Sequence, residues 1–434
     1  MFCGRLFVTL HAQTKIMIIN EATREYVLRH RDDDVRKLAL QGSQPSGVNM
    51  TQALEQIAGW QTARRKLPLW ATTEGIVYPP HLNMEQCSSE QTARYKASLL
   101  VTPSSTVSEG GCFVDLTGGF GVDFYWMSQG FAERIYVEQN AALCAMAEHN
   151  FKLLGHDCSV VCNTAAACLE QLSHANVIYL DPSRRNEHGG RTYDIRDCSP
   201  DVVKLLPLLM EKADKTVLKL SPMLDWHKAL EQLKFVREVH IVSVGNECKE
   251  LLLILSKKVT GGLRLVCVND GQRYEPETIG QNSAPDGGHT ELPPSETVGE
   301  NGKNGFLYEP NASIMKAGCF GALARDFHVK PLASNSHLFL SSVGIDDFPG
   351  RRFQVLAISS ANQKEFKKKF SESLEKVNQK LTSMESANIA VRNFPLTVDQ
   401  LRKKLKLKDG GDFYIFATTL SDGQHKLFIC RKNA

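Results

Sequence analysis

Apolar and polar positions follow different patterns along the 434-residue chain, and the pattern in the middle is the clearest. Between residues 111 and 256, short apolar runs such as "CFVDL", "RIYVEQ", "VIYLD" and "TVLKL" alternate with stretches whose apolar residues recur at helical spacing. Strands that alternate with helices in this way typically form a parallel sheet with helices on both faces. The pattern therefore predicts a doubly wound α/β domain over residues 109–258.

The segments on either side of this domain have patterns of their own. Residues 20–105 carry apolar positions at helical spacing, with helices expected to begin at Asn49 or Thr51 and near Ser88. We therefore expect an N-terminal helical cap region over residues 1–108. Near the other end, runs such as "RFQVLAISS" and "DFYIFATTL" predict strands, and "QKEFKKKFSESLEKVNQKL" predicts a helix. These elements predict a C-terminal α+β module with its own core.

Residues 271–305 interrupt both patterns. Glycine, proline, serine and glutamate dominate this segment, which has six acidic residues against Arg273 and Lys303. Such a segment cannot bury enough apolar surface to order itself, so we predict a disordered surface insert.

Composition bears on the cellular location of the protein and on metal binding, but it does not indicate a function. The net charge is only +3, and the chain has no apolar run near the roughly 20 residues that a membrane-spanning helix needs. The N-terminus lacks the pattern of a signal peptide, and Met17 is a plausible alternative start. The 12 cysteines include no C-x-x-C pair, and the group Cys158, Cys162 and Cys168 lacks the spacing typical of zinc sites. We therefore expect a cytoplasmic protein without a metal.

The segment "CFVDLTGGFGVDFYWMSQGFAERIYVEQN" combines an acid, a glycine turn and a second acid. Its first apolar run ends at Asp115, and glycines, a predicted helix and a second run lead to Glu138. Glycines let the backbone approach a ligand closely, and nucleotides bind at the carboxyl ends of the strands in such sheets. A turn that merely joins a strand to a helix is the alternative. The residues expected to contact a nucleoside here are Asp115, Thr117, Gly118, Gly119, Gly121, Asp123 and Glu138.

The order of acid and glycines selects among nucleotide ligands. A dinucleotide loop reads G-x-G-x-x-G and faces a pyrophosphate, which an acid at Asp115 would repel. The same acid suits the cationic amino-acid tail of S-adenosylmethionine, and Glu138, 23 residues further on, would accept hydrogen bonds from the ribose. Asn163 and Thr164 follow the third predicted strand, where they would reach the adenine or, alternatively, only cap a helix.

These motifs resemble those of class I S-adenosylmethionine-dependent methyltransferases. "VDLTGGFGVD" and "YVEQN" match motifs I and II of that class, with Thr117 at the usual place of the first glycine, and "LDPSRR" matches motif IV. More closely, nearly the whole chain after residue 20 resembles a Bacteroidetes family of predicted RNA methyltransferases, through stretches such as "LKLSPMLD", "NECKELLLI" and "YEPNASIMKAG". The resemblance implies a Rossmann-like methyltransferase domain, a ferredoxin-like piece over 259–316 that contains the insert, and a THUMP-like RNA-binding domain over 317–434.

The stretch "NVIYLDPSRRNEHGGRTYD" ends the fourth predicted strand on an acid and sets two arginines beside it. Asp181 would lie at the mouth of the site, where it could accept a hydrogen bond from a base N–H or act as a general base. Pro182 would stiffen the turn, and Arg184 and Arg185 could hold phosphate or stack on a base. A turn acid and a solvated arginine pair are the alternatives. The predicted catalytic residues are Asp181, Pro182, Ser183 and Arg184.

Departures from familiar patterns limit the chemistry. No aromatic residue follows Pro182, although Tyr193 could replace the stacking partner of amino-group methyltransferases. No Pro-Cys pair follows the acid, and Cys198 precedes Ser199, so covalent attack on a base carbon is not expected. These observations favour a ring or exocyclic nitrogen as the methyl acceptor.

Other charged residues have less certain roles at the sequence level. Lys219 in "LKLSPMLDW" could face phosphate, or it could be a strand lysine that reaches the surface. Glu247, Lys249 and Glu250 are expected only to pair with each other. Glu90, in "SSEQTAR", is expected mainly to belong to a helix cap.

Positive charge gathers at the C-terminus. Residues 361–434 contain 15 lysines and arginines against eight acidic residues, a net of +7, and "KEFKKKF" and "LRKKLKLK" are the densest runs. A solvated helix face explains either run alone, but two runs in one small domain favour contact with a phosphate backbone. Together with the THUMP-like resemblance, which implies binding of structured RNA, this charge leads us to expect tRNA or rRNA as the partner.

The main hypothesis is thus an S-adenosylmethionine-dependent RNA base methyltransferase. A non-catalytic RNA-binding protein with a vestigial cofactor loop, a nicotinamide oxidoreductase, and a methyltransferase that acts on DNA or a small molecule are the alternatives.

Overall fold

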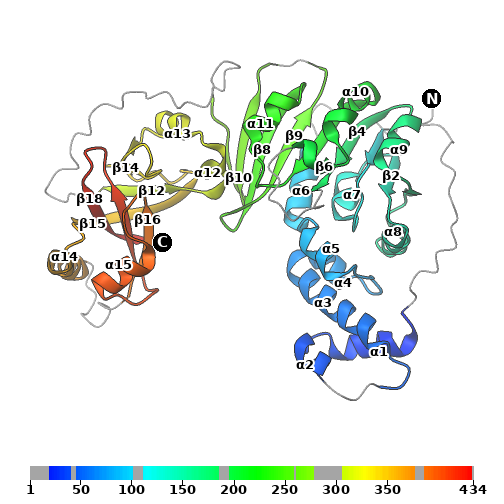
Figure 1. Ribbon diagram of the computed structural model, residues 1–434, viewed down its shortest axis with the longest axis horizontal. Coiled ribbons are helices and arrows are strands. Elements are labelled where there is room, and N and C mark those ends of the chain that lie inside the picture. Colours follow the sequence, from blue (N-terminus) through cyan, green and yellow to red (C-terminus); the bar gives the residue numbers. More distant parts are fainter. Residues whose placement is uncertain are drawn as a thin grey trace. The chain divides into compact units, whose positions relative to one another are not determined.

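The computed structural model describes residues 19–40, 45–100, 111–184, 195–258, 261–277, 305–376 and 386–432 (Figure 1). Contacts within the chain separate two units, Met1–Val239 with Glu250–Gly261, and His240–Lys249 with Gly262–Ala434. In the ranges described, no helix has both the length and the apolar character that crossing a membrane requires.

The first unit begins with helices, as the sequence predicts. Asn49 caps α3 and Ser89 caps α6, because their side chains accept hydrogen bonds from Gln52 N at 3.2 Å and from Thr92 N at 3.2 Å. The helices of this region are α1 (Glu21–His30), α2 (Val35–Leu40), α3 (Met50–Lys66), α4 (Pro68–Thr72), α5 (His81–Gln86) and α6 (Glu90–Ser98).

A large mixed sheet follows, with its strands in the order β11-β10-β8-β9-β7-β4-β1-β2-β3. The pairs β1–β2, β1–β4, β2–β3 and β4–β7 are parallel, whereas β9 runs antiparallel to β7. The sheet is therefore not parallel throughout. Its strands in this part of the chain are β1 (Cys112–Asp115), β2 (Glu133–Glu138), β3 (Ser159–Cys162), β4 (Ala175–Leu180), β7 (Ala213–Leu220), β8 (Val236–Val244) and β9 (Glu247–Leu255).

Helices link successive parallel strands of this sheet. Side chains that are almost fully buried fill the space beneath them, including Phe113, Phe124, Tyr136 and Phe151. The linking helices are α7 (Val122–Met127), α8 (Ala141–Leu153), α9 (Ala165–Gln171), α10 (Val202–Lys212) and α11 (Trp226–Gln232). After β4, the short strands β5 (Ser183–Arg184) and β6 (Cys198–Ser199) pair, and the 3₁₀ turn η1 (Ile195–Asp197) lies between them.

The second unit contains a sheet in the order β13-β14-β12-β15-β18-β17-β16. Helices α14 and α15 contribute Phe366, Phe370, Leu401 and Leu405 to a core that also takes Ile415 and Ile429 from the sheet. The elements here are β10 (Arg264–Asn269), β11 (Gln272–Tyr274), β12 (Phe306–Pro310), α12 (Ala312–Ala317), α13 (Phe320–Asp326), β13 (Lys330–Pro331), β14 (Phe339–Ser341), β15 (Gly350–Ser359), α14 (Gln363–Lys376), β16 (Asn388–Arg392), α15 (Val398–Leu405), β17 (Phe413–Thr419) and β18 (His425–Lys432).

Two details differ from the sequence analysis. The stretch "SIMKAGCFGALARDF", expected to be one helix, forms α12 and α13, because Gly318 ends α12 with a φ of 71°. Residues 272–274, expected within the disordered insert, form β11, and residues 278–304 of that insert lie outside the described residues.

Candidate active site

Parallel strands bring four charged side chains to one edge of the sheet. Asp115 and Glu138 are the last residues of β1 and β2, Asp181 follows β4, and Lys219 is the penultimate residue of β7. Leu251 of the antiparallel β9 pairs with Leu220, so Glu250 reaches the same edge from the opposite direction. Residues far apart in sequence therefore meet where ligands bind in such sheets.

The glycine turn after β1 is shaped by two aromatic rings beneath it. A Cβ on Gly118 would lie 2.1 Å from the Tyr136 ring, and a Cβ on Gly121 would lie 2.5 Å from the Phe151 ring. Gly119 has a φ of 55°, and only Thr117 O, at 3.9 Å, lies near its Cβ position. The turn is thus packed closely on its inner side and open at Gly119, which allows a ligand to approach the backbone.

Thr117 connects the two acids at the ends of β1 and β4. Its backbone N–H donates to Asp115 Oδ1 at 2.9 Å, and its hydroxyl accepts a hydrogen bond from Asp181 N at 2.6 Å. Asp115 is fully buried, and its Oδ2 has no hydrogen-bond partner among the described residues. Burial raises the pKa of Asp115 well above its ordinary value. A cationic group at this edge would supply the partner that Oδ2 lacks.

Glu138 holds the other side of the turn. Its two carboxylate oxygens accept hydrogen bonds from Gly119 N at 3.0 Å and Asn140 N at 2.8 Å, and each oxygen has a further lone pair for a ligand hydroxyl. Asn163 follows β3 beside this acid, since its N–H donates to Glu138 O at 3.1 Å. The Thr164 side chain caps α9 by accepting from Ala167 N at 3.3 Å. The cap thus occupies Thr164, and adenine contact by Asn163 and Thr164 stays a prediction.

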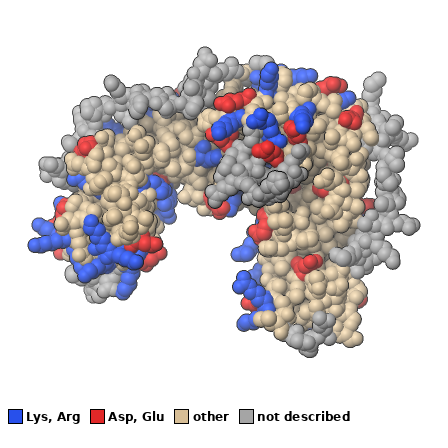
Figure 2. Space-filling view, viewed as in Figure 1, with Lys and Arg blue, Asp and Glu red and all other residues tan. Residues whose placement is uncertain are grey.

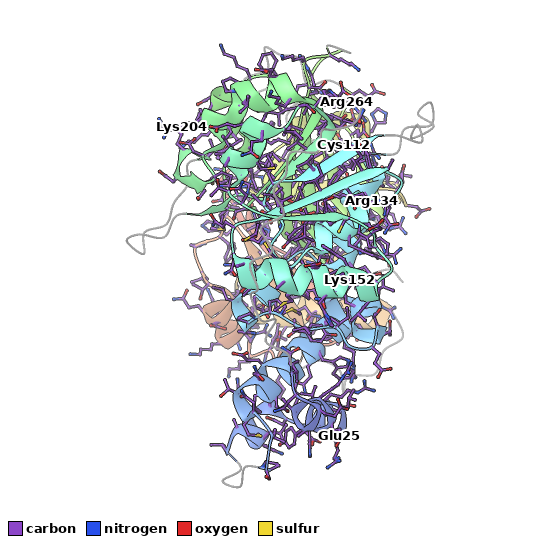
Figure 3. The ribbon with its side chains drawn as sticks, turned by 90° about the vertical axis from the view of Figure 1, so that its right-hand side faces the viewer. Glu25, Cys112, Arg134, Lys152, Lys204 and Arg264 are labelled. Carbon is purple, nitrogen blue, oxygen red and sulfur yellow. The ribbon has the colours of Figure 1, made fainter. Side chains whose placement is uncertain are left out.

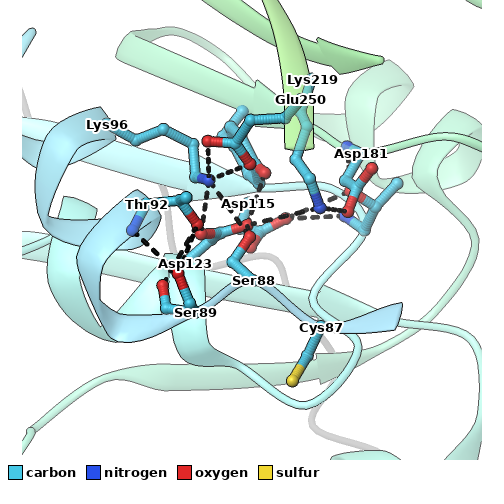
Figure 4. A network of polar contacts seen from close by, with 12 residues as sticks. Cys87, Ser88, Ser89, Thr92, Lys96, Asp115, Asp123, Asp181, Lys219 and Glu250 are labelled. Carbon is cyan, nitrogen blue, oxygen red and sulfur yellow. Dashed lines mark hydrogen bonds and ion pairs between the residues drawn. The ribbon is translucent and has the colours of Figure 1, made fainter. Parts of the chain in front are cut away.

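A network of ionic side chains lies behind this edge (Figure 4). Lys219 Nζ lies 2.5 Å from Asp181 Oδ2 and 4.0 Å from Asp123 Oδ2. Lys96 Nζ lies 2.6 Å and 2.8 Å from the two Glu250 oxygens and 3.1 Å from Asp123 Oδ1. We call these residues, Lys96, Asp123, Asp181, Lys219 and Glu250, the buried ion network.

Asp123 is the centre of the buried ion network. Besides the two lysines, the Ser88 and Tyr179 hydroxyls each donate to its Oδ2 at 2.7 Å. Burial favours the neutral acid, but Lys96 and Lys219 outweigh it and lower the pKa of Asp123. Both oxygens of Asp123 thus face protein groups, and its predicted contact with a cofactor stays a prediction.

The network also fixes the charge of Lys219. Burial disfavours the ammonium, but Asp181, Asp123 and Glu250 together raise the pKa of Lys219 above its ordinary value. Lys219 is therefore an ammonium at neutral pH. Burial raises the pKa of Glu250, against the opposing effect of Lys96.

The turn after Asp181 is only partly described. Pro182 is buried, Ser183 is exposed, and the backbone of Ser183 and Arg184 pairs with β6. The side chain of Arg184 and all of Arg185 and Tyr193 lie outside the described residues.

The sequence analysis missed two members of the network. Lys96 was not singled out, and Glu250 was expected to pair with Glu247 and Lys249, whereas Glu250 pairs with Lys96, and Lys249 pairs with Glu247 at 2.6 Å. Glu250 lies in the stretch "NECKELLLI" named above, but nothing in that stretch points to Lys96, which lies 154 positions away. The available signal was a charged residue within or next to an apolar run, as at Lys219 in "TVLKL" and at Glu250, which directly precedes "LLLIL". Among the described residues, no group of His, Cys, Asp and Glu side chains is placed to hold a metal ion.

Comparison with known proteins identifies the C-terminal part. A family model for a ferredoxin-like domain matches residues 306–349, and a model described as THUMP domain-like matches residues 350–432. The ferredoxin-like match thus lies mostly C-terminal to the range 259–316 expected for it. No curated protein matches the chain.

Solved structures extend the likeness to nearly the whole chain. The structure named "putative methyltransferase from Porphyromonas gingivalis W83" is 29% identical, with a TM-score of 0.77 over 95% of this chain and 98% of that one. A class I S-adenosylmethionine-dependent methyltransferase of Listeria monocytogenes, itself named putative, is 10% identical, with a TM-score of 0.36 over 58% and 93%. A T. thermophilus 16S rRNA methyltransferase, solved with AdoMet and guanosine, is 12% identical, with a TM-score of 0.30 over 43% and 45%.

The first of these structures and the two family models confirm the fold class and the resemblance expected from the sequence: the chain has the mixed α/β fold of the Porphyromonas gingivalis protein and ends in ferredoxin-like and THUMP-like domains.

Proposed function

We propose that this chain is a methyltransferase that uses S-adenosylmethionine to methylate a nucleotide of structured RNA, either tRNA or rRNA. The observation that carries the proposal is the edge of the sheet where Asp115, Gly119, Glu138 and Asp181 meet. The likeness to a structure named as a methyltransferase supports the reaction, and the THUMP domain-like match supports RNA as the substrate.

The residues present fit S-adenosylmethionine. The orphaned, buried Asp115 Oδ2 suits the cationic amino-acid tail, and the open side of Gly119 leaves room beside the backbone. Glu138 retains lone pairs for ribose hydroxyls. When bound, S-adenosylmethionine supplies an electrophilic methyl group on a sulfonium. The protein's own contribution is to align an acceptor at Asp181 and to exclude water from the edge.

The base nitrogen expected from the sequence is one class of acceptor that Asp181 could serve. Its side chain is 35% exposed, so a base N–H could donate to it. Pro182 is buried, where it would make the turn after Asp181 rigid, and Ser183 is exposed at the mouth of the site. Arg184 would contact a phosphate.

The predicted RNA surface lies on α14 and α15. Figure 2 shows lysine and arginine side chains gathered over these two helices. The exposed lysines on or directly after these helices are Lys364, Lys367, Lys368, Lys403, Lys404, Lys406 and Lys408. Such lysines would bind phosphates without distinguishing between nucleotides, so the site on the sheet would select the nucleotide.

Two measurements test the proposal. Calorimetry should detect binding of S-adenosylmethionine, and a labelled methyl group should enter RNA isolated from a strain that lacks the gene. Glu138→Gln should weaken cofactor binding about 10-fold or more, because it removes a charged acceptor for the ribose. Glu148, an exposed acid on α8 that pairs with Lys152 at 2.9 Å, offers the matched control Glu148→Gln.

Each alternative has its own outcome. Binding without incorporation into RNA or DNA would indicate a vestigial cofactor loop, incorporation into DNA would change the substrate, and binding of a nicotinamide cofactor would replace the reaction class.

A further inference from the structure

We propose that the acceptor is a ribose hydroxyl of the RNA rather than a base nitrogen, with Lys219 and Asp181 as its catalytic residues and Lys96, Asp123 and Glu250 as positioning residues. The inference rests on the proposed function and names the acceptor atom of that same site. It departs from the base nitrogen that the sequence favours.

The buried ion network is costly, which suggests a chemical purpose. Lys96 is 0% exposed, Glu250 2% and Lys219 9%. Buried ion pairs are often no more stabilising than well-packed apolar side chains, because desolvation offsets their attraction. Four such groups beside the partly exposed Asp181, at the edge where a ligand would bind, are therefore better explained by the reaction than by stability.

The network presents one cation and one anion together at its outer end. Lys96 and Glu250 close its inner end, where Lys96 is inaccessible to solvent. At the outer end, the Asp181 side chain is 35% exposed and Lys219 Nζ lies 2.5 Å from it. In the described part of the chain, Lys219 is the side chain that donates to the Asp181 carboxylate, through Oδ2. A substrate atom that reaches Asp181 therefore meets an ammonium and a carboxylate at once.

A neutral nitrogen would gain little from this arrangement. Such an atom becomes positively charged as it accepts a methyl group from a sulfonium, and a neighbouring ammonium opposes that charge. A base also needs a stacking surface, whereas no aromatic residue follows Pro182 in "LDPSRR". The carboxylate would help a nitrogen acceptor, but the ammonium would not.

A hydroxyl uses both members of the pair. The hydroxyl must lose its proton as its oxygen attacks, and Asp181 accepts that proton and passes it to solvent through its exposed side. The Lys219 ammonium donates a hydrogen bond to the same oxygen and stabilises its negative charge. In the balanced step the O–C bond forms as the C–S bond breaks, and the bonding pair leaves with sulfur as a neutral thioether. A ribose hydroxyl lies on the sugar–phosphate backbone and needs no base pocket.

The remaining residues hold Lys219 in place. Asp123 attracts its ammonium from 4.0 Å, and Asp123 is itself fixed by Ser88, Tyr179 and Lys96. Lys96 also neutralises Glu250. These groups are too deep to touch a substrate, so they act through Lys219.

The first experiment reads the position of the methyl group. RNA from a strain that lacks the gene is incubated with the full-length protein and isotopically labelled S-adenosylmethionine, and its nucleosides are fragmented by mass spectrometry. We expect the label on the sugar. Label on a base would overturn this inference and leave the proposed function standing, whereas no label in any RNA would overturn both.

The second experiment needs no cofactor. Once the labelled nucleotide is located, the protein's affinity is compared for an RNA oligonucleotide that contains it and for one with a 2′-deoxy sugar there. The hydroxyl should strengthen binding about 3- to 10-fold, the net effect of a typical hydrogen bond. That difference should vanish in Lys219→Met, and equal affinity of the wild-type protein for both oligonucleotides would contradict the proposal.

Variants then separate catalysis from folding. Lys219→Ala should lower kcat about 10²- to 10³-fold, the usual effect of removing a preorganised donor, and should raise KM for RNA no more than about 10-fold, and Lys219→Arg should restore part of kcat. Lys96→Met should lower kcat less. Lys204→Ala, which removes an exposed lysine that pairs with Asp201 at 3.1 Å, should leave kcat unchanged (Figure 3). Circular dichroism and cofactor affinity check the fold, and a normal kcat in folded Lys219→Ala would refute the role of Lys219.

Discussion

At the scale of single residues, one buried histidine should make the stability of the first unit depend on pH. His156 is 5% exposed, and its Nε2 lies 2.8 Å from the Ser128 hydroxyl. Burial, reinforced by the nearby Arg134, lowers the pKa of His156 to about 4. In the unfolded chain the same imidazole takes up a proton near pH 6.5. The stability of the folded state should therefore depend on pH even in the absence of a cofactor or substrate.

The sign of this effect follows from linkage. Between pH 6.5 and 4 the unfolded chain binds a proton that the folded chain does not, so stability falls as pH decreases through that window. Between pH 7.5 and 5, the contribution of His156 to the free energy of unfolding should decline by about 2 kcal/mol. The variant His156→Gln keeps a hydrogen-bonding group near Ser128. Over this range its free energy of unfolding should fall by about 2 kcal/mol less than that of the wild-type protein.

Urea unfolding at the two pH values measures the difference. All four tryptophans, Trp60, Trp70, Trp126 and Trp226, lie in the first unit, so their fluorescence reports its unfolding. Parallel loss of stability in both proteins would show that other groups cause the pH dependence.

Single residues also show where sequence reasoning stops. Asp115, Glu138 and Asp181 could be placed at the carboxyl ends of their strands because each ends an apolar run beside a recognisable motif. Lys96 and Glu250 could not be joined, because the pairing depends on how α6 packs against the edge of the sheet. Local pattern predicts elements, but contacts between distant elements depend on tertiary packing.

At the scale of elements, two buried amides tie the segment between α4 and α5 to its neighbours. Asn150 of α8 accepts from Val77 N and donates to Val77 O, both at 2.9 Å. Gln56 of α3 accepts from Tyr78 N at 2.9 Å and donates to Tyr78 O at 2.8 Å. The two side chains thus satisfy the backbone of an extended segment much as neighbouring strands would. Nothing in the pattern of "TEGIVYPP" predicts this arrangement.

Removal of either amide should therefore destabilise the first unit. Asn150→Ala leaves the partly buried N–H and C=O of Val77 without these partners, and Gln56→Ala does the same to the buried Tyr78, so each variant should lose about 1–3 kcal/mol of stability in urea unfolding. Gln129→Ala is the matched control, because Gln129 is exposed and donates to Tyr125 O at 3.1 Å, and its change should stay within about 0.5 kcal/mol. A loss for Asn150→Ala no larger than that of the control would contradict the role assigned to the amide.

The large mixed sheet shows that the local sequence pattern predicts strands but not their arrangement. Alternating apolar runs predicted its strands, and parallel order was confirmed for β1, β2, β3, β4 and β7. The tight turn between β8 and β9, with Asn246 at a φ of 60°, reverses the chain, and β9 inserts antiparallel beside β7. That insertion carries Glu250 to the edge of the site. Strand direction in a sheet follows from connection geometry, which apolar runs alone do not show.

At the scale of the whole molecule, charge is divided unevenly along the chain. Residues 361–434 carry +7, so the remaining residues must carry about −4 to give the net of +3. The structure gathers the exposed lysines of α14 and α15 on two helices that contact each other and cover the sheet of the THUMP-like domain. This domain should therefore contact mainly the phosphates of the RNA, and the affinity should depend strongly on salt concentration.

Replacing four of these lysines tests that expectation. The variant Lys367→Ala, Lys368→Ala, Lys403→Ala, Lys404→Ala should weaken RNA binding about 10-fold or more at moderate salt and should flatten the dependence of log Kd on log salt. Each phosphate contact contributes about 0.7–0.9 to that slope, so the loss of four contacts should lower it by roughly 3. Filter binding across a range of salt concentrations measures both quantities, with the full-length protein throughout.

Matched controls separate this effect from a general loss of positive charge. Lys152 and Lys204 are exposed on α8 and α10, and each already pairs with an acid, Glu148 at 2.9 Å and Asp201 at 3.1 Å (Figure 3). Their double replacement by alanine should leave the slope unchanged, since neither lysine lies in the basic domain. Because α14 and α15 belong to the second unit, the quadruple variant should also retain the wild-type affinity for S-adenosylmethionine. An unchanged salt slope in the quadruple variant would place the RNA contact elsewhere on the protein.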